Sequence, residues 1–142
     1  MKNTIPQEIC TFIQNNHVVS IACQADEQLW SASCFYAFDA VNNRLIILTS
    51  QNTQHGSLMQ KHPKIAGTIA GQPCLISDIE GVQFQAIAQI LPKNEQEEAL
   101  AIYYRRHAYA QNMTSDVWQI RFTRIKYTSN KISFAEKLEW LS

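Results

Sequence analysis

The sequence has few charged residues and no excess of either sign. Charged side chains make up 17% of the 142 residues, and 12 Lys and Arg balance 12 Asp and Glu. Proteins that bind duplex nucleic acid or membrane surfaces normally carry a basic excess, so neither partner is expected. A small domain with so little charge leaves surface for a partner to cover, which favours oligomerisation.

Several diagnostic patterns are also missing. No run of 18 apolar residues occurs, and the opening segment MKNTIPQEIC has no apolar signal core, so we expect a cytoplasmic protein with no membrane span. The signatures G-x-S-x-G, H-E-x-x-H and the P-loop do not occur, and no His or Cys spacing predicts a metal site. The four cysteines form no C-x-x-C pair and are expected to be free, buried thiols: Cys10, Cys23, Cys34 and Cys74.

What the sequence does contain is a series of short segments in which apolar and polar residues alternate. Its length and its 46% apolar residues predict one globular domain, residues 1–142, with its own core. The expected strands cover residues 17–23, 29–38, 44–50, 65–70, 82–91 and 118–127. Residues 45–48 are continuously apolar, which predicts burial on both faces. The apolar face of the last strand switches between Phe122 and Ile125, which predicts a bulge.

Short helices are expected between and beside these strands. They cover residues 4–16, 53–62, 95–107 and a last segment that starts at Ser133. Capping boxes are predicted at Thr4 and Ser133, and Asn94 is the predicted cap of the third helix. The order lacks the regular strand–helix rhythm of a doubly wound sheet. The fold class is therefore mainly β (β+α): a six-stranded antiparallel split β-barrel with short peripheral helices.

One ungapped segment carries a family resemblance. Residues 45–69, LIILTSQNTQHGSLMQKHPKIAGTI, resemble the core motif of the pyridoxamine 5'-phosphate oxidase-like, FMN-binding split barrels. That motif is an apolar strand, a Thr at its end, a Ser or Thr opening a helix with a basic residue just inside, and a Pro before the next strand. Those positions hold Thr49, Thr53, His55 and Pro63. The segment EGVQFQAIAQIL resembles the next strand of that superfamily, and the chain length and closing SFAEKLEW resemble the YhbP-type group of small bacterial proteins.

The resemblance implies a homodimer that binds FMN at the subunit interface, with the phosphate where the short helix begins. A flavin-dependent oxidoreductase is implied, but no residue indicates its substrate or a catalytic acid or base. The implied cofactor-binding residues are Ser33, Cys34, Phe35, Tyr36, Thr49, Ser50, Thr53, Gln54 and His55. A helix start offers free N–H groups and partial positive charge to a phosphate, and Gly56 allows close backbone approach.

The sequence departs from the family pattern in its charge. Many flavin-binding relatives carry Lys or Arg where Gln54 and His55 stand, and residues 31–36 contain no basic residue. The alternative is a cofactor-free dimeric barrel that binds another small anion or serves as an interaction module. In that case Thr53 is a plain helix cap and His55 an exposed first-turn residue. The run IYYRRHAY, residues 102–109, fits a helix C-terminus better than a single-stranded nucleic-acid contact.

Overall fold

The computed structural model describes residues 3–131 and 136–142. The helices of this part of the chain are α1 (Gln7–Asn15), α2 (Gln54–Lys61) and α3 (Lys93–Arg106), with two short 3-10 turns, η1 (Ile76–Asp78) and η2 (Ala108–Asn112). The strands are β1 (Val18–Ala25), β2 (Gln28–Phe35), β3 (Ala37–Asp39), β4 (Arg44–Leu48), β5 (Lys64–Ala70), β6 (Glu80–Ile90), β7 (Val117–Ser129) and β8 (Glu136–Leu141).

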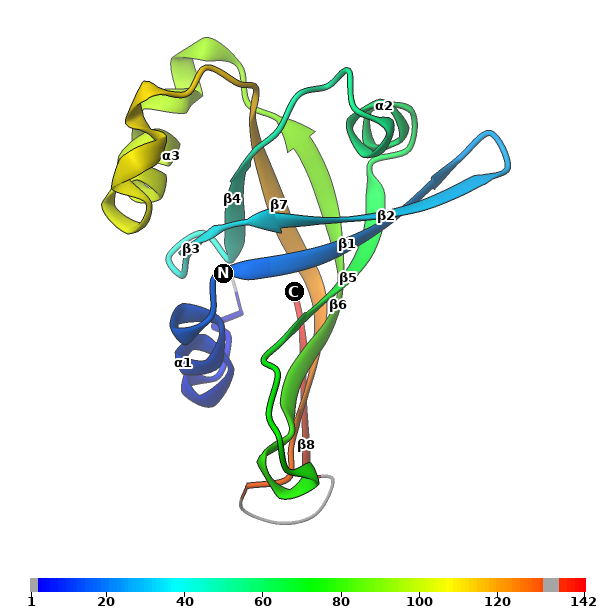
Figure 1. The fold of residues 1–142 in the computed structure, drawn as a ribbon, viewed down its shortest axis with the longest axis vertical. Coiled ribbons are helices and arrows are strands. Elements are labelled where there is room, and N and C mark those ends of the chain that lie inside the picture. The colour runs from blue at the N-terminus through cyan, green and yellow to red at the C-terminus, as the bar shows by residue number, and fades with distance from the viewer. Residues whose placement is uncertain (1–2, 132–135) are drawn as a thin grey trace.

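All the strands belong to one antiparallel sheet that curls into a split barrel (Figure 1). The order across the sheet is β2-β1-β5-β6-β7-β4-β3, and β8 also pairs with β7. The long strand β7 pairs with β6 along one side, and along the other side its first half pairs with β4 and its second half with β8. Strands β2 and β3 lie at opposite ends of the order but are consecutive in the chain. The single residue between them, Tyr36, therefore joins the two ends of the sheet.

Tyr36 holds this joint through three hydrogen bonds. Its backbone N–H donates to the carbonyl of His17 at 3.0 Å, and its hydroxyl donates to the carbonyl of Ile13 at 2.6 Å. Its own carbonyl accepts from Nε2 of His107 at 2.7 Å. The side chain is 1% exposed, and burial raises the pKa of the phenol, so the hydroxyl stays protonated as a donor. One residue thus ties the ends of α1 and α3 to the seam of the barrel.

The core has two parts that share strand β4. Leu45 and Ile47 face the barrel interior with Trp118, whereas Ile46 faces α3 and packs in a cluster with Tyr103. These three β4 residues are fully buried, which confirms the prediction of burial on both faces for them, whereas Leu48 is half-buried. Among the described residues, no helix is both long enough and apolar enough to cross a bilayer.

The predicted bulge is present in β7. Gln85 of β6 pairs with Arg124, but the next residue, Ala86, pairs with Phe122. Thr123 is therefore the extra residue of β7. The bulge brings Phe122 and Ile125, which are three positions apart, onto the same core face, with exposed fractions of 1% and 0%.

Two differences from the expected secondary structure raise the strand count from six to eight. Residues 29–38 divide at Tyr36 into two strands. The helix predicted from Ser133 is wrong where it can be checked: residues 132–135 lie outside the described part, and Glu136–Leu141 form strand β8. The second half of β7 offers a free edge there, and pairing with it carries Trp140 into the core at 6% exposed. Tertiary contact overrides the local capping pattern.

The helix caps and cysteines also differ in part from expectation. Thr4 and Asn94 do not cap helices, because α1 and α3 begin directly after Pro6 and Pro92, with no side-chain cap. Proline has its φ fixed near the value that a helix start requires, and it lacks the N–H that would go unpaired there. Of the four thiols, all free, Cys23 is buried, Cys10 and Cys34 are half-buried, and Cys74 is exposed, contrary to prediction.

The joint at Tyr36 generates the first prediction. Tyr36→Phe removes the buried hydroxyl and leaves its partner carbonyl less satisfied, so we expect the free energy of unfolding to fall by about 1–2 kcal/mol in urea denaturation. Tyr109→Phe is the matched control, because that ring is 97% exposed. The control should change stability by less than about 0.5 kcal/mol. Equal effects of the two substitutions would contradict the role given to the Tyr36 hydroxyl.

Candidate functional site

The first turn of α2 is built by a tight loop that follows β4. Thr53 is the N-cap: its Oγ1 accepts the N–H of Gly56 at 2.9 Å and donates to the carbonyl of Ser50 at 2.8 Å. A Cβ at Gly56 would lie 2.3 Å from the carbonyl oxygen of Ser50, so no larger residue fits. The lack of a side chain at Gly56 therefore serves the packing of this loop rather than the approach of a ligand.

The loop leaves two backbone donors pointing out of the helix. In the described part of the chain, no hydrogen bond uses the N–H groups of Gln54 and His55. These are the first two residues of α2, where the helix has no internal acceptors for them. Two free N–H groups at the positive end of a helix form an anion-binding arrangement.

His55 lies against this loop and is half-buried. Its Nε2 is 2.7 Å from Oγ1 of Thr49 and 3.3 Å from Oγ1 of Thr53. Burial lowers the pKa of the imidazole, so the ring is neutral near pH 7 and contributes a hydrogen bond rather than a charge. Thr49 is itself fixed, since its carbonyl accepts from Nε1 of Trp118 at 2.9 Å.

An acidic residue that the sequence did not bring to notice lies beside the same loop. Oδ2 of Asp116 accepts the N–H of Gln51 at 2.9 Å, and the carbonyl of Asp116 accepts the N–H of Thr49 at 3.1 Å. Asp116 orders the loop but also places a negative charge at the segment that leads into α2. Because 65 residues separate it from Gln51, only the pairing of β4 with β7 brings the two together.

The predicted ring-binding segment lies on the neighbouring strand. Pairing of Ala37 with Ile46 brings the end of β2 beside the end of β4. Ser33 and Phe35 are exposed, whereas Cys34 is half-buried and Tyr36 is buried in the core. Burial also raises the pKa of the Cys34 thiol to about 11, so it remains protonated. Only Ser33 and Phe35 offer side chains of this segment to the surface.

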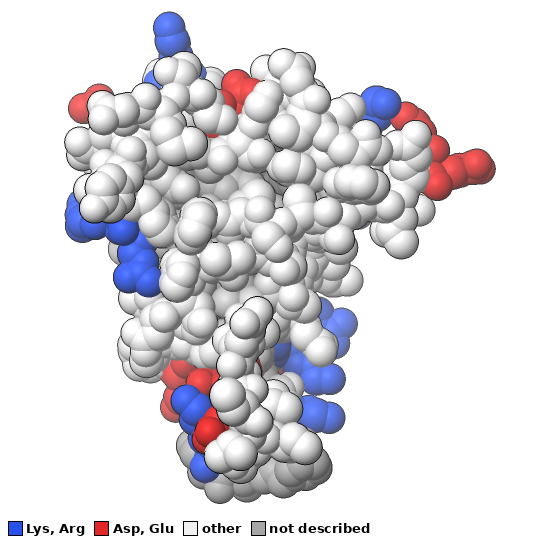
Figure 2. All heavy atoms as spheres, in the orientation of Figure 1, with Lys and Arg blue, Asp and Glu red and all other residues white. Residues whose placement is uncertain are grey.

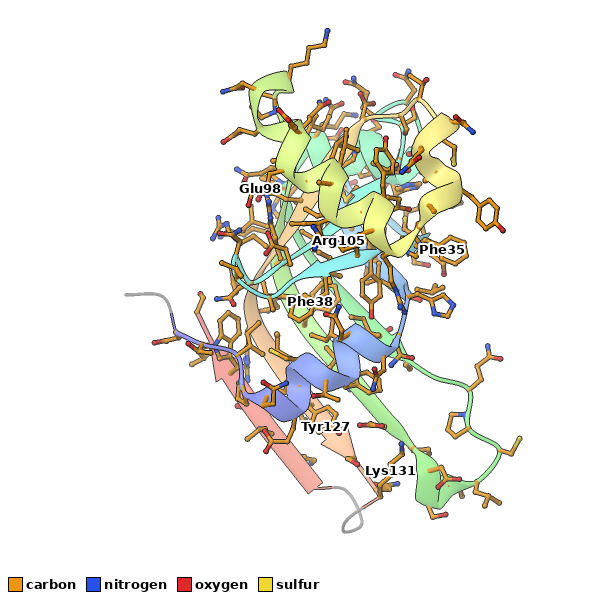
Figure 3. All side chains as sticks on the ribbon, turned by 90° about the vertical axis from the view of Figure 1, so that its left-hand side faces the viewer. Phe35, Phe38, Glu98, Arg105, Tyr127 and Lys131 are labelled. Atoms are coloured by element: carbon orange, nitrogen blue, oxygen red, sulfur yellow. The ribbon has the colours of Figure 1, made fainter. Side chains whose placement is uncertain are left out.

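Phe35 is flanked by two histidines that sequence reasoning missed. The His17 ring stacks nearly parallel to Phe35 with centroids 5.8 Å apart, and the His107 ring lies 5.7 Å away on a tilt. We call these three rings the Phe35 platform; Figure 3 shows Phe35 near the end of α3. His17 precedes β1 and His107 follows α3, so no local pattern indicated that they would meet.

The remaining predicted residues connect these two groups. Gln54 donates from Nε2 to Oε1 of Gln28 at 2.6 Å, which links α2 to β2, and Oγ of Ser50 accepts the N–H of Asn52 at 3.1 Å. The structure thus gathers Thr49 to His55 in one loop and Ser33 to Phe35 on the adjacent strand. A cleft found in the described part of the chain is lined by α1, α3 and residues 36–38 rather than by the loop at α2.

The chain is similar in sequence to bacterial proteins over nearly its whole length. No family model matches it. A UPF0306 protein of Haemophilus ducreyi is 49% identical over 138 residues, which cover 96% of this chain and 94% of that protein. The UPF0306 protein YhbP of Escherichia coli is 37% identical over 133 residues, covering 94% and 90%. The chain belongs to the UPF0306 family. The predicted YhbP-type relationship is confirmed.

Solved structures of low sequence identity share the fold of this UPF0306 chain. A heme binding protein from Mycobacterium smegmatis matches with a TM-score of 0.80 at 16% identity, covering 99% of this chain and 59% of that one. ChuZ from Campylobacter jejuni matches with a TM-score of 0.77 at 11% sequence identity, covering 96% of this chain and 58% of that one. A FAD-binding protein from Mesorhizobium loti matches at 0.66 and 15%, covering 87% and 94%. This UPF0306 chain thus spans about three fifths of the first two, and the predicted split-barrel fold is confirmed.

Burial of His55 generates the second prediction. The folded state has a His55 pKa below the unfolded value, so acid favours the unfolded chain. At pH values well above the unfolded pKa of 6.5, His55 should not affect the free energy of unfolding. As the pH falls through 6.5 toward the folded pKa, His55 should lower the free energy of unfolding. We expect an NMR titration of the His55 ring to give a pKa below 6.5, and His55→Gln to lose less stability than the parent between pH 7 and 5. A titration at or above the unfolded value would contradict the burial of this ring.

Proposed function

We propose that the protein is a homodimer that binds FMN between its two subunits and acts as a flavin-dependent oxidoreductase. The observation that carries the proposal is the start of α2, where the N–H groups of Gln54 and His55 are free within a loop ordered by Thr53. The split-barrel neighbours include a protein named as FAD-binding and another named as heme binding, which supports a planar cofactor in general. A bound flavin would supply the redox chemistry, and the protein would supply position and electrostatics.

The phosphate end of FMN fits the loop through neutral donors. The two free N–H groups and the Ser50 hydroxyl lie at the helix start, which Thr53 orders through its bonds to Ser50 and Gly56. The His55 ring lies beside these groups, and a phosphate near it would raise the pKa that burial lowers. Binding should therefore tighten as the pH falls toward about 6, where the second ionisation of the phosphate is itself lost.

The ring end fits the Phe35 platform. Phe35 is 57% exposed, and an isoalloxazine ring is a flat aromatic surface that stacks on such side chains. Ser33 lies two positions earlier on the same side of β2, within reach of polar ring atoms. Tyr36 would position Phe35 rather than bind the ring itself, because its side chain is buried and its N–H and carbonyl are both hydrogen-bonded within the protein.

A second subunit would turn this open surface into an enclosed site. Figure 2 shows that the middle of the face over β1 and β2 carries almost no charged side chains. The apolar side chains Leu29, Trp30 and Phe35 on β2 are 76%, 50% and 57% exposed. In addition, β2 is an edge strand of the sheet. Exposed apolar residues on an unpaired edge favour association with a second copy.

The lack of positive charge at the start of α2 favours a different function. The loop at α2 contains no Lys or Arg, His55 is neutral near pH 7, and the Asp116 carboxylate repels a phosphate. A dimeric barrel without a cofactor, which binds another small anion or serves as an interaction module, is therefore the second candidate. The two candidates differ in whether flavin binds at all.

Flavin binding is the third prediction. Titration of the protein with FMN, followed by flavin fluorescence, should give a Kd below about 100 μM, which corresponds to roughly 5.5 kcal/mol. Riboflavin, which lacks the phosphate, should bind more weakly. Asp116→Asn should tighten FMN binding severalfold, because it removes the charge but keeps an oxygen that can accept from Gln51. His55→Arg should tighten it too, because a guanidinium adds a permanent charge.

The same titration distinguishes the candidates. Equal affinity for FMN and riboflavin would remove the phosphate contact at α2 from the proposal. Binding of hemin without binding of FMN would replace flavin by heme as the planar cofactor. If neither binds in this range, the cofactor-free barrel is the better description.

Assembly is the fourth prediction. Light scattering at micromolar concentration should give twice the 16.2 kDa subunit mass. Replacing Leu29 and Trp30 together by Lys should shift the mass toward the monomer, because charge is then placed in an apolar interface. Val41→Lys is the control, since Val41 is 83% exposed but lies in the turn between β3 and β4. A parent protein with the monomer mass would contradict the proposed dimer.

A further inference from the structure

A cleft of about 180 Å³ lies between the end of α1 and the last turn of α3. Its apolar floor includes Ile13, Phe38 and Ile102, and its rim carries Arg105 and Arg106. In Figure 3, Arg105 and Phe38 lie in the space between the two helices. None of the residues that line the cleft is acidic. The cleft therefore combines an apolar floor with two positive charges.

The two guanidinium groups have few partners in the described part of the chain. Neither takes part in any of the four ion pairs found there. Arg106 makes a long hydrogen bond of 3.4 Å to the carbonyl of Asn16, and no hydrogen bond is found for Arg105. The acidic residues of α3 lie in its first two turns, and Glu98 is seven residues before Arg105, about 10 Å along the helix axis. No intrahelical ion pair reaches either arginine.

The helix dipole explains where these arginines lie on α3, but it gives their side chains no hydrogen-bond acceptors. Basic residues in the last turn of a helix are favoured by the helix dipole, which accounts for their position on α3. The end of α1 also faces the cleft, but two of the carbonyls of its last turn are already occupied. The carbonyl of Ile13 accepts from Tyr36 and Asn16, and that of Phe12 accepts from the Asn16 amide. Most guanidinium donors above the apolar floor are left without acceptors.

We propose that this cleft binds a small organic acid, whose carboxylate pairs with Arg105 and Arg106 and whose apolar body lies on Ile13, Phe38 and Ile102. Guanidinium and carboxylate match in geometry and charge, and the apolar floor selects an acid that carries a hydrocarbon or aromatic group over a bare inorganic anion. The site goes beyond the proposed flavin function: it shares Tyr36 with the strand connection beside Phe35, but no residue of the α2 loop lines it and it requires no cofactor.

The test uses benzoate as the probe and amide chemical shifts as the readout. In the parent protein, benzoate should shift signals of residues around Ile13, Phe38 and Ile102, with a Kd on the order of 1 mM. Arg105→Ala combined with Arg106→Ala should raise that Kd by at least about tenfold, because both charge-assisted pairs are lost. Arg121→Ala is the matched control, since it removes an exposed arginine from β7 and should leave the Kd unchanged.

Two further ligands make the result specific. Benzylamine, which has a similar body and the opposite charge, should not bind at the cleft. Inorganic phosphate should bind more weakly than benzoate. The proposal is overturned if the double variant binds benzoate as the parent does, if benzylamine shifts the same signals, or if phosphate binds better than benzoate. Loss of FMN binding alone would leave this site intact, so the failure of either proposal is distinguishable.

Discussion

The joint at Tyr36 is the constraint on which the rest of the molecule depends. A curled sheet has two ends, and here one continuous chain segment runs from the strand at one end to the strand at the other. The direction of that segment fixes where β2 lies relative to β4, and hence how far the Phe35 platform lies from the loop at α2. Because the joint also anchors α1 and α3, it sets the walls of the cleft between them.

Features determined by neighbouring residues were predictable from the sequence. Alternation located the strands, the phase change located the bulge at Thr123, and the position of Thr53 at the start of the predicted helix indicated its cap. Features that require distant segments of the chain to meet could not be predicted in this way. The last segment forms a strand because β7 offers it an edge. Only the curling of the sheet brings three further residues to the candidate site: Asp116, His17 and His107. Five of the nine predicted site residues were correctly expected to share a loop because they lie between residues 49 and 55.

The electrostatics of the candidate site differ from those of a site built on basic side chains. Backbone dipoles and hydroxyl groups would carry the interaction with an anion, and the Asp116 carboxylate opposes it. The free energy of such a contact depends strongly on how well water is excluded, since partial charges gain most in a low dielectric. A monomer with this loop exposed would bind an anion weakly, so affinity and assembly are linked.

The extra residue in β7 has a consequence for how this chain can change in length. Before Thr123 the even-numbered residues of β7 face the barrel interior, and after it the odd-numbered residues do. The strand therefore consists of two segments whose alternation is shifted by one residue. Loss of one residue at Thr123 would remove the bulge and restore simple alternation, with Phe122 and Ile125 still opposite Ala86 and Phe84 on the core face. A one-residue insertion or deletion elsewhere in the strand, with the bulge kept, would instead turn the residues beyond it to the opposite face, including the surface that receives Trp140. Thr123 is therefore the position of β7 at which the loss of a single residue reverses no face.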